Sequence, residues 1–112
     1  MIDNSTNRFG LTERDMQTFQ KIFSAFPDVK EVQIFGSRAK GNYKNGSDID
    51  LAIVNDDFNS NTLAKLAGEF EESSLPYKVD IVAMKYLKLH ELIDHINRVG
   101  VVFYKRTNSE NK

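Results

Sequence analysis

The sequence predicts an α/β (α+β) fold, a small mixed β-sheet with helices mainly on one face. Short apolar segments bounded by glycine, proline or polar residues alternate with segments in which apolar residues recur at helical spacing. A length of 112 residues with 40% hydrophobic residues suits one small domain. We therefore expect residues 1–112 to form a single domain, with an ordered core at about 9–105 and polar tails at both ends.

Three amphipathic helices are predicted from the spacing of apolar residues. The first begins at Thr12, where Asp15 completes an N-terminal capping box, and ends at the following proline. The second covers about residues 63–70. The third covers about residues 89–96, with Gly100 as its C-terminal cap.

Four strands are predicted at residues 29–35, 48–54, 77–83 and 101–104. We expect residues 1–8 to be disordered or loosely attached, and residues 106–112 to form a polar tail.

A glycine turn follows the first strand. Gly36 allows the backbone to reverse sharply and to come close to a ligand. Ser37 adds a hydroxyl and a backbone N–H. If Arg38 to Lys40 begin a helical turn, the N–H groups at its start would face a phosphate, and Arg38 and Lys40 would add positive charge. This segment is therefore a candidate phosphate-binding turn.

The second strand carries two carboxylates, Asp48 and Asp50. Strand residues two apart share a face and lie about 6.6 Å apart along the chain. Two carboxylates at this separation repel each other, and a Mg²⁺ ion bound by oxygen ligands would reverse that repulsion. The alternative is a solvated strand end without a metal.

A third carboxylate, Asp80, stands among apolar residues in the third strand. An aspartate is unfavourable there by strand propensity and by desolvation, and such conflicts concentrate at functional sites. The alternative is an aspartate on an edge strand, facing water.

These segments together resemble the signature of the DNA polymerase β-like nucleotidyltransferases, G-S-x-A-x-G, five residues, then S-D-x-D-[LI]. The matching positions are Gly36, Ser37, Ala39, Gly41, Ser47, Asp48, Asp50 and Leu51. Over about residues 12–105 the order of elements resembles the minimal nucleotidyltransferases (MNT domains) of bacteria and archaea. The resemblance implies the polymerase β-like palm fold, with the third carboxylate on the next core strand.

The resemblance also implies an activity, the transfer of a nucleoside monophosphate, AMP from ATP or another NTP, to a hydroxyl. Asp48, Asp50 and Asp80 would be catalytic and would bind one or two Mg²⁺ ions, for which Mn²⁺ can substitute. The nucleotide-binding residues would be Gly36, Ser37, Arg38 and Ser47. Asp80 would bind the metal near the acceptor and orient its hydroxyl.

A chain of this size leaves few residues to form a pocket around a second substrate, so we expect the acceptor hydroxyl to belong to a partner protein. By resemblance the partner is a HEPN-domain RNase toxin, adenylylated on a tyrosine by this chain as its antitoxin. Two alternatives stay open. The protein could neutralise the toxin by contact alone, or it could be the catalytic subunit of a small-molecule nucleotidyltransferase completed by a separate helical subunit.

Composition excludes several other classes. A net charge of −1 argues against direct nucleic-acid binding, and the absence of cysteine excludes disulfides and thiolate zinc sites. No apolar run approaches the ~18 residues of a membrane span, and no signal-peptide core is present, so we expect a cytoplasmic protein. His90 and His95 are five residues apart, too far around a helix for a zinc pair, and are interpreted as surface residues.

Overall fold

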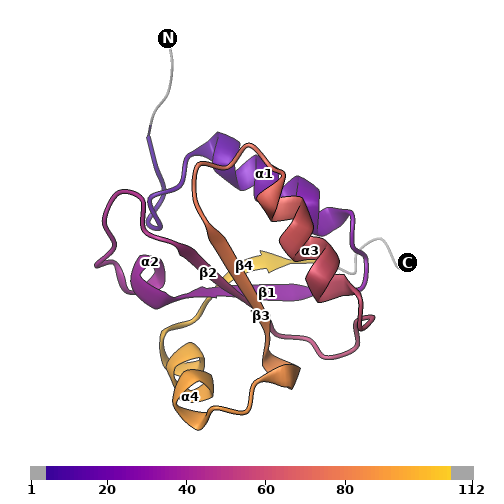
Figure 1. Cartoon of the computed structure of the whole chain (residues 1–112). Helices are drawn as coiled ribbons and strands as arrows, with labels where there is room; N and C mark the ends of the chain where they lie inside the picture. Colours follow the sequence, from indigo (N-terminus) through magenta and orange to yellow (C-terminus); the bar gives the residue numbers. More distant parts are fainter. Residues whose placement is uncertain (1–4, 107–112) are drawn as a thin grey trace.

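The computed structural model describes residues 5–106 and contains one four-stranded mixed sheet, in the order β3-β2-β1-β4 (Figure 1). The central strands are β1 (Glu31–Phe35) and β2 (Ile49–Ile53), and the edge strands are β3 (Val79–Ala83) and β4 (Val101–Lys105). β1 runs antiparallel to β2 and β4, whereas β2 and β3 are parallel. A parallel pair needs a long crossover connection, and α3 lies within that connection.

The helices are α1 (Glu13–Ser24), α2 (Gly36–Lys40), α3 (Thr62–Glu71) and α4 (His90–Val99). A short 3₁₀ turn, η1 (Met84–Tyr86), follows β3. Every strand and amphipathic helix predicted from the sequence is present, with ends shifted by a few residues. No helix in the described part of the chain is both long enough and apolar enough to cross a membrane.

Local signals at the helix ends account for the start of α1 and, in part, for the end of α4. The Thr12 hydroxyl accepts the Asp15 N–H, and the Asp15 carboxylate accepts the Thr12 N–H, both at 3.1 Å, which confirms the capping box. Gly100 follows α4 as expected, but its φ of −65° and ψ of 140° are extended rather than left-handed. Glycine is needed there because a Cβ would collide with the Gln33 side chain and the Ile96 carbonyl.

The main core lies between one face of the sheet and helices α1 and α3. Ile34, Leu51 and Ile53 have no exposed surface, and Phe19 and Phe23 of α1 pack beside them. Aromatic rings interlock there, with the Phe19 and Phe103 centroids 5.0 Å apart in an edge-to-face arrangement. Burial on this face fixes the strand register, because a slip of one residue would expose these side chains.

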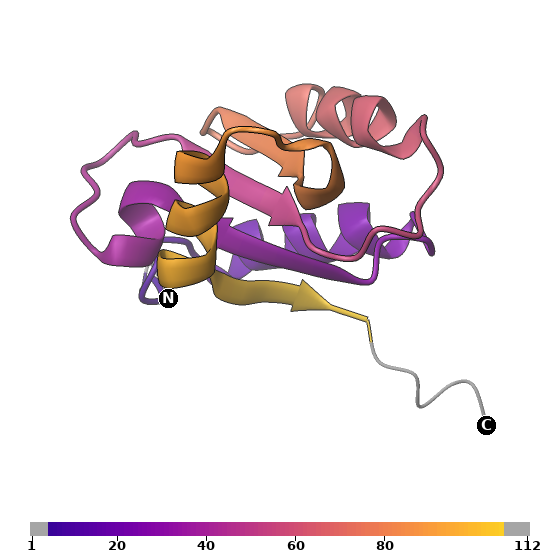
Figure 2. The ribbon, with the colours of Figure 1, turned by 90° about the horizontal axis from the view of Figure 1, so that it is seen from below.

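The opposite face of the sheet carries a smaller apolar cluster under α4. Phe35, Ala52 and Ile96 are buried there. Figure 2 shows α4 on the side of the sheet away from α1. The prediction of helices mainly on one face therefore holds for α1 and α3, and α4 covers part of the other face.

The described part of the N-terminal segment is more ordered than the sequence suggested. Thr6 forms a bridge with Thr12, and the Asn7 side chain accepts the N–H groups of Phe9 and Leu11. Phe9 and Leu11 are buried in the main core. Residues 5–8 are exposed, but the Thr6 bridge and the Asn7 side chain connect them to the segment that follows. The remainder of the two predicted tails, 1–4 and 107–112, lies outside the described residues.

Candidate active site

The glycine turn lies directly against a carboxylate. β1 ends at Phe35, and Gly36 begins α2 with a φ of +77°, a left-handed conformation that favours glycine. The short helix ends at Gly41, so the predicted helical turn is present. A Cβ built on Gly36 would meet the Asp50 carboxylate. The turn and the carboxylate strand therefore form one contiguous site.

The sheet register brings two of the predicted carboxylates together. Asp50 pairs with Phe35 on one side and with Asp80 on the other. Adjacent strands lie about 4.8 Å apart, so the two aspartates are direct neighbours. Both project from the face opposite the buried Leu51 and the core-packed Ile81. Asp48 comes just before β2 and is exposed.

The electrostatics of Asp50 are those of a crowded carboxylate. Partial burial raises the pKa of Asp50, and the negative charges of Asp80 and Asp48 raise it further. His95, on α4, opposes this effect and favours the charged form. A divalent cation beside the group would relieve the repulsion among the three carboxylates.

The carboxylates of the site fit a Mg²⁺ ion that takes only part of its ligands from the protein. Among residues 5–106, no three carboxylates or imidazoles are grouped closely enough to form a complete metal cage. Mg²⁺ is usually held by one or two carboxylates, with waters and substrate phosphates completing the octahedron. The neighbouring pair Asp50 and Asp80 suits that mode, and a three-aspartate ligand set stays a prediction.

Asp80 occupies a more open position than expected. The resemblance implied a core strand, but β3 is an edge strand of the described sheet. The Asp80 side chain is 48% exposed and lies 4.0 Å from the Lys78 ammonium group, a contact weakened by solvent. Asp80 is therefore a solvent-facing aspartate on an edge strand, as the alternative interpretation expected, and it also lies beside Asp50, as a functional carboxylate would.

Arg38 departs from its predicted role. Its side chain is only 2% exposed, and its guanidinium donates to the carbonyls of Phe9 and Ser47. This placement leaves the guanidinium committed to the backbone rather than free for a phosphate. The Ser47 hydroxyl accepts the Lys44 N–H at 2.9 Å, which leaves its own O–H able to donate to a ligand. Ser37 stands directly after Gly36, as the motif requires.

His95 is the site residue that sequence reasoning missed. Its ring packs edge-to-face against the ring of Phe35, with centroids 6.0 Å apart. Phe35 is the residue immediately before the glycine turn. The signal was available in the helical periodicity, because His95 lies beside the buried Ile96 and three residues after Leu92, which packs on the same cluster. Only the fold reveals that this cluster borders Asp50.

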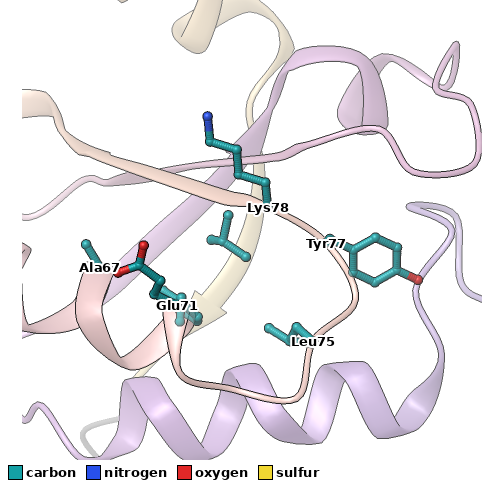
Figure 3. A pocket seen from close by; sticks show the side chains of 7 residues that line it. Ala67, Glu71, Leu75, Tyr77 and Lys78 are labelled. Carbon is teal, nitrogen blue, oxygen red and sulfur yellow. The ribbon is translucent and has the colours of Figure 1, made fainter.

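A separate hollow lies at the start of β3, between α3 and the segment that follows it (Figure 3). Ala67 and Glu71 line it from α3, and Leu75 and Tyr77 line it from the connecting segment. None of the three predicted catalytic aspartates belongs to its lining. We therefore assign the site to the open carboxylate face rather than to this hollow.

Several solved structures of similar fold come from toxin–antitoxin complexes. One is a toxin–antitoxin structure with AMP-PNP, at 21% identity over 87% of this chain and 78% of that chain, with a TM-score of 0.65. Another is an MNT antitoxin in complex with the tri-AMPylated HEPN toxin of Shewanella oneidensis. It is 19% identical over 86% of this chain and 74% of that chain, with a TM-score of 0.58. At these identities the likeness shows the fold.

Sequence comparison adds a closer but shorter match. The "Probable protein adenylyltransferase MntA" of Haemophilus influenzae is 46% identical over 54 residues, which are 46% of this chain and 46% of that protein. The match thus spans under half the length of this curated relative. The family model "Polymerase beta, Nucleotidyltransferase" matches residues 17–109, which include the glycine turn and all three aspartates. The chain therefore belongs to the polymerase β nucleotidyltransferase family.

Proposed function

We propose that the protein is a Mg²⁺-dependent nucleotidyltransferase that transfers AMP from ATP to a hydroxyl group of a partner protein. One observation carries the proposal: Asp50 lies against the Gly36 turn and in register with Asp80. A turn suited to phosphates thereby adjoins a carboxylate pair suited to a divalent cation. Transfer of a nucleotide needs both in one place.

Each residue has a distinct role in this scheme. Gly36 and Ser37 bind the triphosphate through the backbone of the turn. Asp48 and Asp50, with Asp80 on the acceptor side, would hold Mg²⁺ or Mn²⁺, which when bound neutralises phosphate charge as a Lewis acid. Asp80 orients the acceptor hydroxyl and takes up its proton. The acceptor oxygen then bonds to the α-phosphorus, the bond to the β-phosphate oxygen breaks, and pyrophosphate leaves.

The open geometry of the site supports a macromolecular acceptor. Asp48 is exposed and Asp80 is about half exposed, so a second substrate can approach from solvent. A partner protein would supply its own walls and would hold its hydroxyl near the α-phosphate. The AMPylated HEPN toxin bound to an MNT antitoxin of similar fold supports a HEPN protein as this partner. We propose a tyrosine as the modified residue and the cytoplasm as the compartment.

The proposal is tested by measuring the intact mass of the acceptor. The protein encoded beside this chain is incubated with the purified chain and Mg·ATP, and then weighed by mass spectrometry. We expect the addition of one or more AMP units with the wild-type chain and none with Asp48→Asn/Asp50→Asn. EDTA should abolish the addition, and Mn²⁺ should restore it.

Two results would contradict the proposal in different ways. Inhibition of the partner without a change of its mass, preserved in the double variant, would assign the chain to antitoxins that act by contact. Incorporation of labelled AMP into a small molecule, in the presence of a helical subunit, would assign it to the small-molecule enzymes.

A further inference from the structure

We propose that Arg38 is a positioning residue, which orients the peptide before Asp48 from a buried location and does not touch the nucleotide. The inference rests on the proposed function, because it concerns how one metal-binding aspartate is held. It is carried by a group of contacts that we call the Arg38 cluster: the Arg38 guanidinium, the Tyr43 and Tyr77 rings, and the carbonyls of Phe9 and Ser47.

The hydrogen bonds of Arg38 converge on the loop that precedes the carboxylates. Its Nε and Nη2 both donate to the Ser47 carbonyl, at 3.1 and 3.0 Å, and Nη1 donates to the Phe9 carbonyl at 2.7 Å. A planar guanidinium can bind one carbonyl with two N–H groups while a third bonds elsewhere, which a lysine ammonium cannot reproduce in the same plane. The side chain thus ties the loop to the N-terminal segment.

Two tyrosine rings hold the guanidinium in this orientation. Its Cζ lies 5.0 Å from the Tyr43 ring centroid and 4.7 Å from that of Tyr77, within the range of cation–π attraction. The Tyr77 hydroxyl donates to Asp15, which also caps α1. The cluster therefore connects α1, α2, the loop and the entry to β3.

The effect on the active site follows from peptide geometry. The carbonyl of Ser47 and the N–H of Asp48 belong to one planar peptide unit. Fixing that carbonyl with two hydrogen bonds fixes the direction in which the chain enters β2. Asp48 is itself exposed. The buried Ile49 fixes the chain after it, and the Arg38 cluster fixes the peptide before it.

The N-terminal segment completes the arrangement from outside. A Cβ on Gly10 would lie 2.6 Å from the Tyr43 ring and 2.9 Å from Arg38 Nη1, so the backbone passes directly over the cluster. Phe9, which supplies the second carbonyl, lies before the part of the chain that the family model matches. The segment thus contributes to the site although it carries none of the motif residues.

The test measures metal binding directly. Mn²⁺ is titrated by electron paramagnetic resonance into the chain saturated with α,β-methylene-ATP, whose α–β bond is not cleaved by transfer. We expect Arg38→Lys to weaken Mn²⁺ binding by about tenfold. Nucleotide binding without metal should stay within about twofold of wild type, because Arg38 makes no phosphate contact. Tyr43→Leu, which removes one ring, should shift Mn²⁺ binding in the same direction and decides the question if Arg38→Lys does not fold.

Arg106→Lys is the matched control, because Arg106 also donates to backbone carbonyls, those of Ser24 and Phe26 at the far end of α1. It should lower the melting temperature and leave Mn²⁺ affinity unchanged. If Arg38→Lys and Tyr43→Leu behave like this control, Arg38 is merely structural and the inference fails. If Arg38→Lys weakens metal-free nucleotide binding as strongly, Arg38 is a phosphate ligand and the inference also fails. Absence of Mn²⁺ binding in the wild type would instead overturn the proposed function, and this inference with it.

Discussion

Alanine substitutions at Gly36 and Gly41, compared with each other, distinguish the cost of backbone strain from damage to the active site. Gly36 has a φ of +77°, and Gly41, five residues later, has a φ of +89°. An alanine in this left-handed region costs roughly 1–2 kcal/mol, so both Gly36→Ala and Gly41→Ala should lose about that much stability. The two positions differ in their surroundings. A Cβ on Gly41 meets nothing within 4 Å, whereas one on Gly36 meets the Asp50 carboxylate and lies 3.2 Å from its Cγ.

The Asp50 side chain is short, so it can avoid the new methyl group only by rotating its carboxylate away. Losing one charge-assisted contact is worth roughly 1.5–3 kcal/mol, which weakens binding by about 10- to 150-fold. We expect this loss of Mg·ATP affinity in Gly36→Ala and not in Gly41→Ala. Calorimetric titration measures the affinity, and chemical denaturation measures the stability of each variant. Equal Mg·ATP affinity in the two variants would show that the phosphates and metal do not occupy this turn.

Two further predictions concern one carboxylate in the active site, Asp80, and one outside it, Asp28. Asp80→Asn should retain Mg·ATP binding within a few-fold and lose transfer, because the group acts on the acceptor; single-turnover transfer near the wild-type rate would refute that role. At Asp28 burial opposes ionisation, but hydrogen bonds from the Thr62 hydroxyl and the Asn59 N–H outweigh it and lower the pKa of the carboxyl below 3.8. A lowered folded pKa adds stability that is present above the unfolded pKa and is lost as pH falls through the folded one. Asp28→Asn should therefore be less stable than wild type by roughly 1 kcal/mol at pH 7, and the difference should shrink as the pH falls through the lowered folded pKa of Asp28; a difference that stays constant with pH would exclude the linkage.

The local parts of the site could be predicted from sequence, because their determinants are close in the chain. Strand periodicity selects Asp50 for the face opposite Leu51, and the motif glycine has the left-handed φ that a sharp turn requires. The capping box at Thr12 was also readable, since its partners are three residues apart.

The remaining features depend on contacts between distant segments. The pairing of Asp50 with Asp80 requires a parallel register across a crossover, which no local pattern specifies. The burial of Arg38 depends on the Phe9 carbonyl, 29 residues earlier, so a basic residue in a phosphate motif was assigned to the ligand rather than to the backbone. His95 was interpreted as a surface residue because the periodicity that places it near Leu92 and Ile96 does not show that α4 covers the face of the sheet beside Asp50.

Because β2 and β3 pair in parallel, insertions and deletions should be tolerated in the loop that follows β2 but not within β3. Residues 55–61 follow β2 as a loop, where extra residues would lengthen an excursion at a small entropic cost. Within residues 79–83 a single insertion or deletion would move Asp80 to the opposite face, toward α3, and would bring an apolar neighbour beside Asp50. Natural variation in chain length should therefore accumulate in the loop and be excluded from the strand, even though the strand lies at the edge of the sheet.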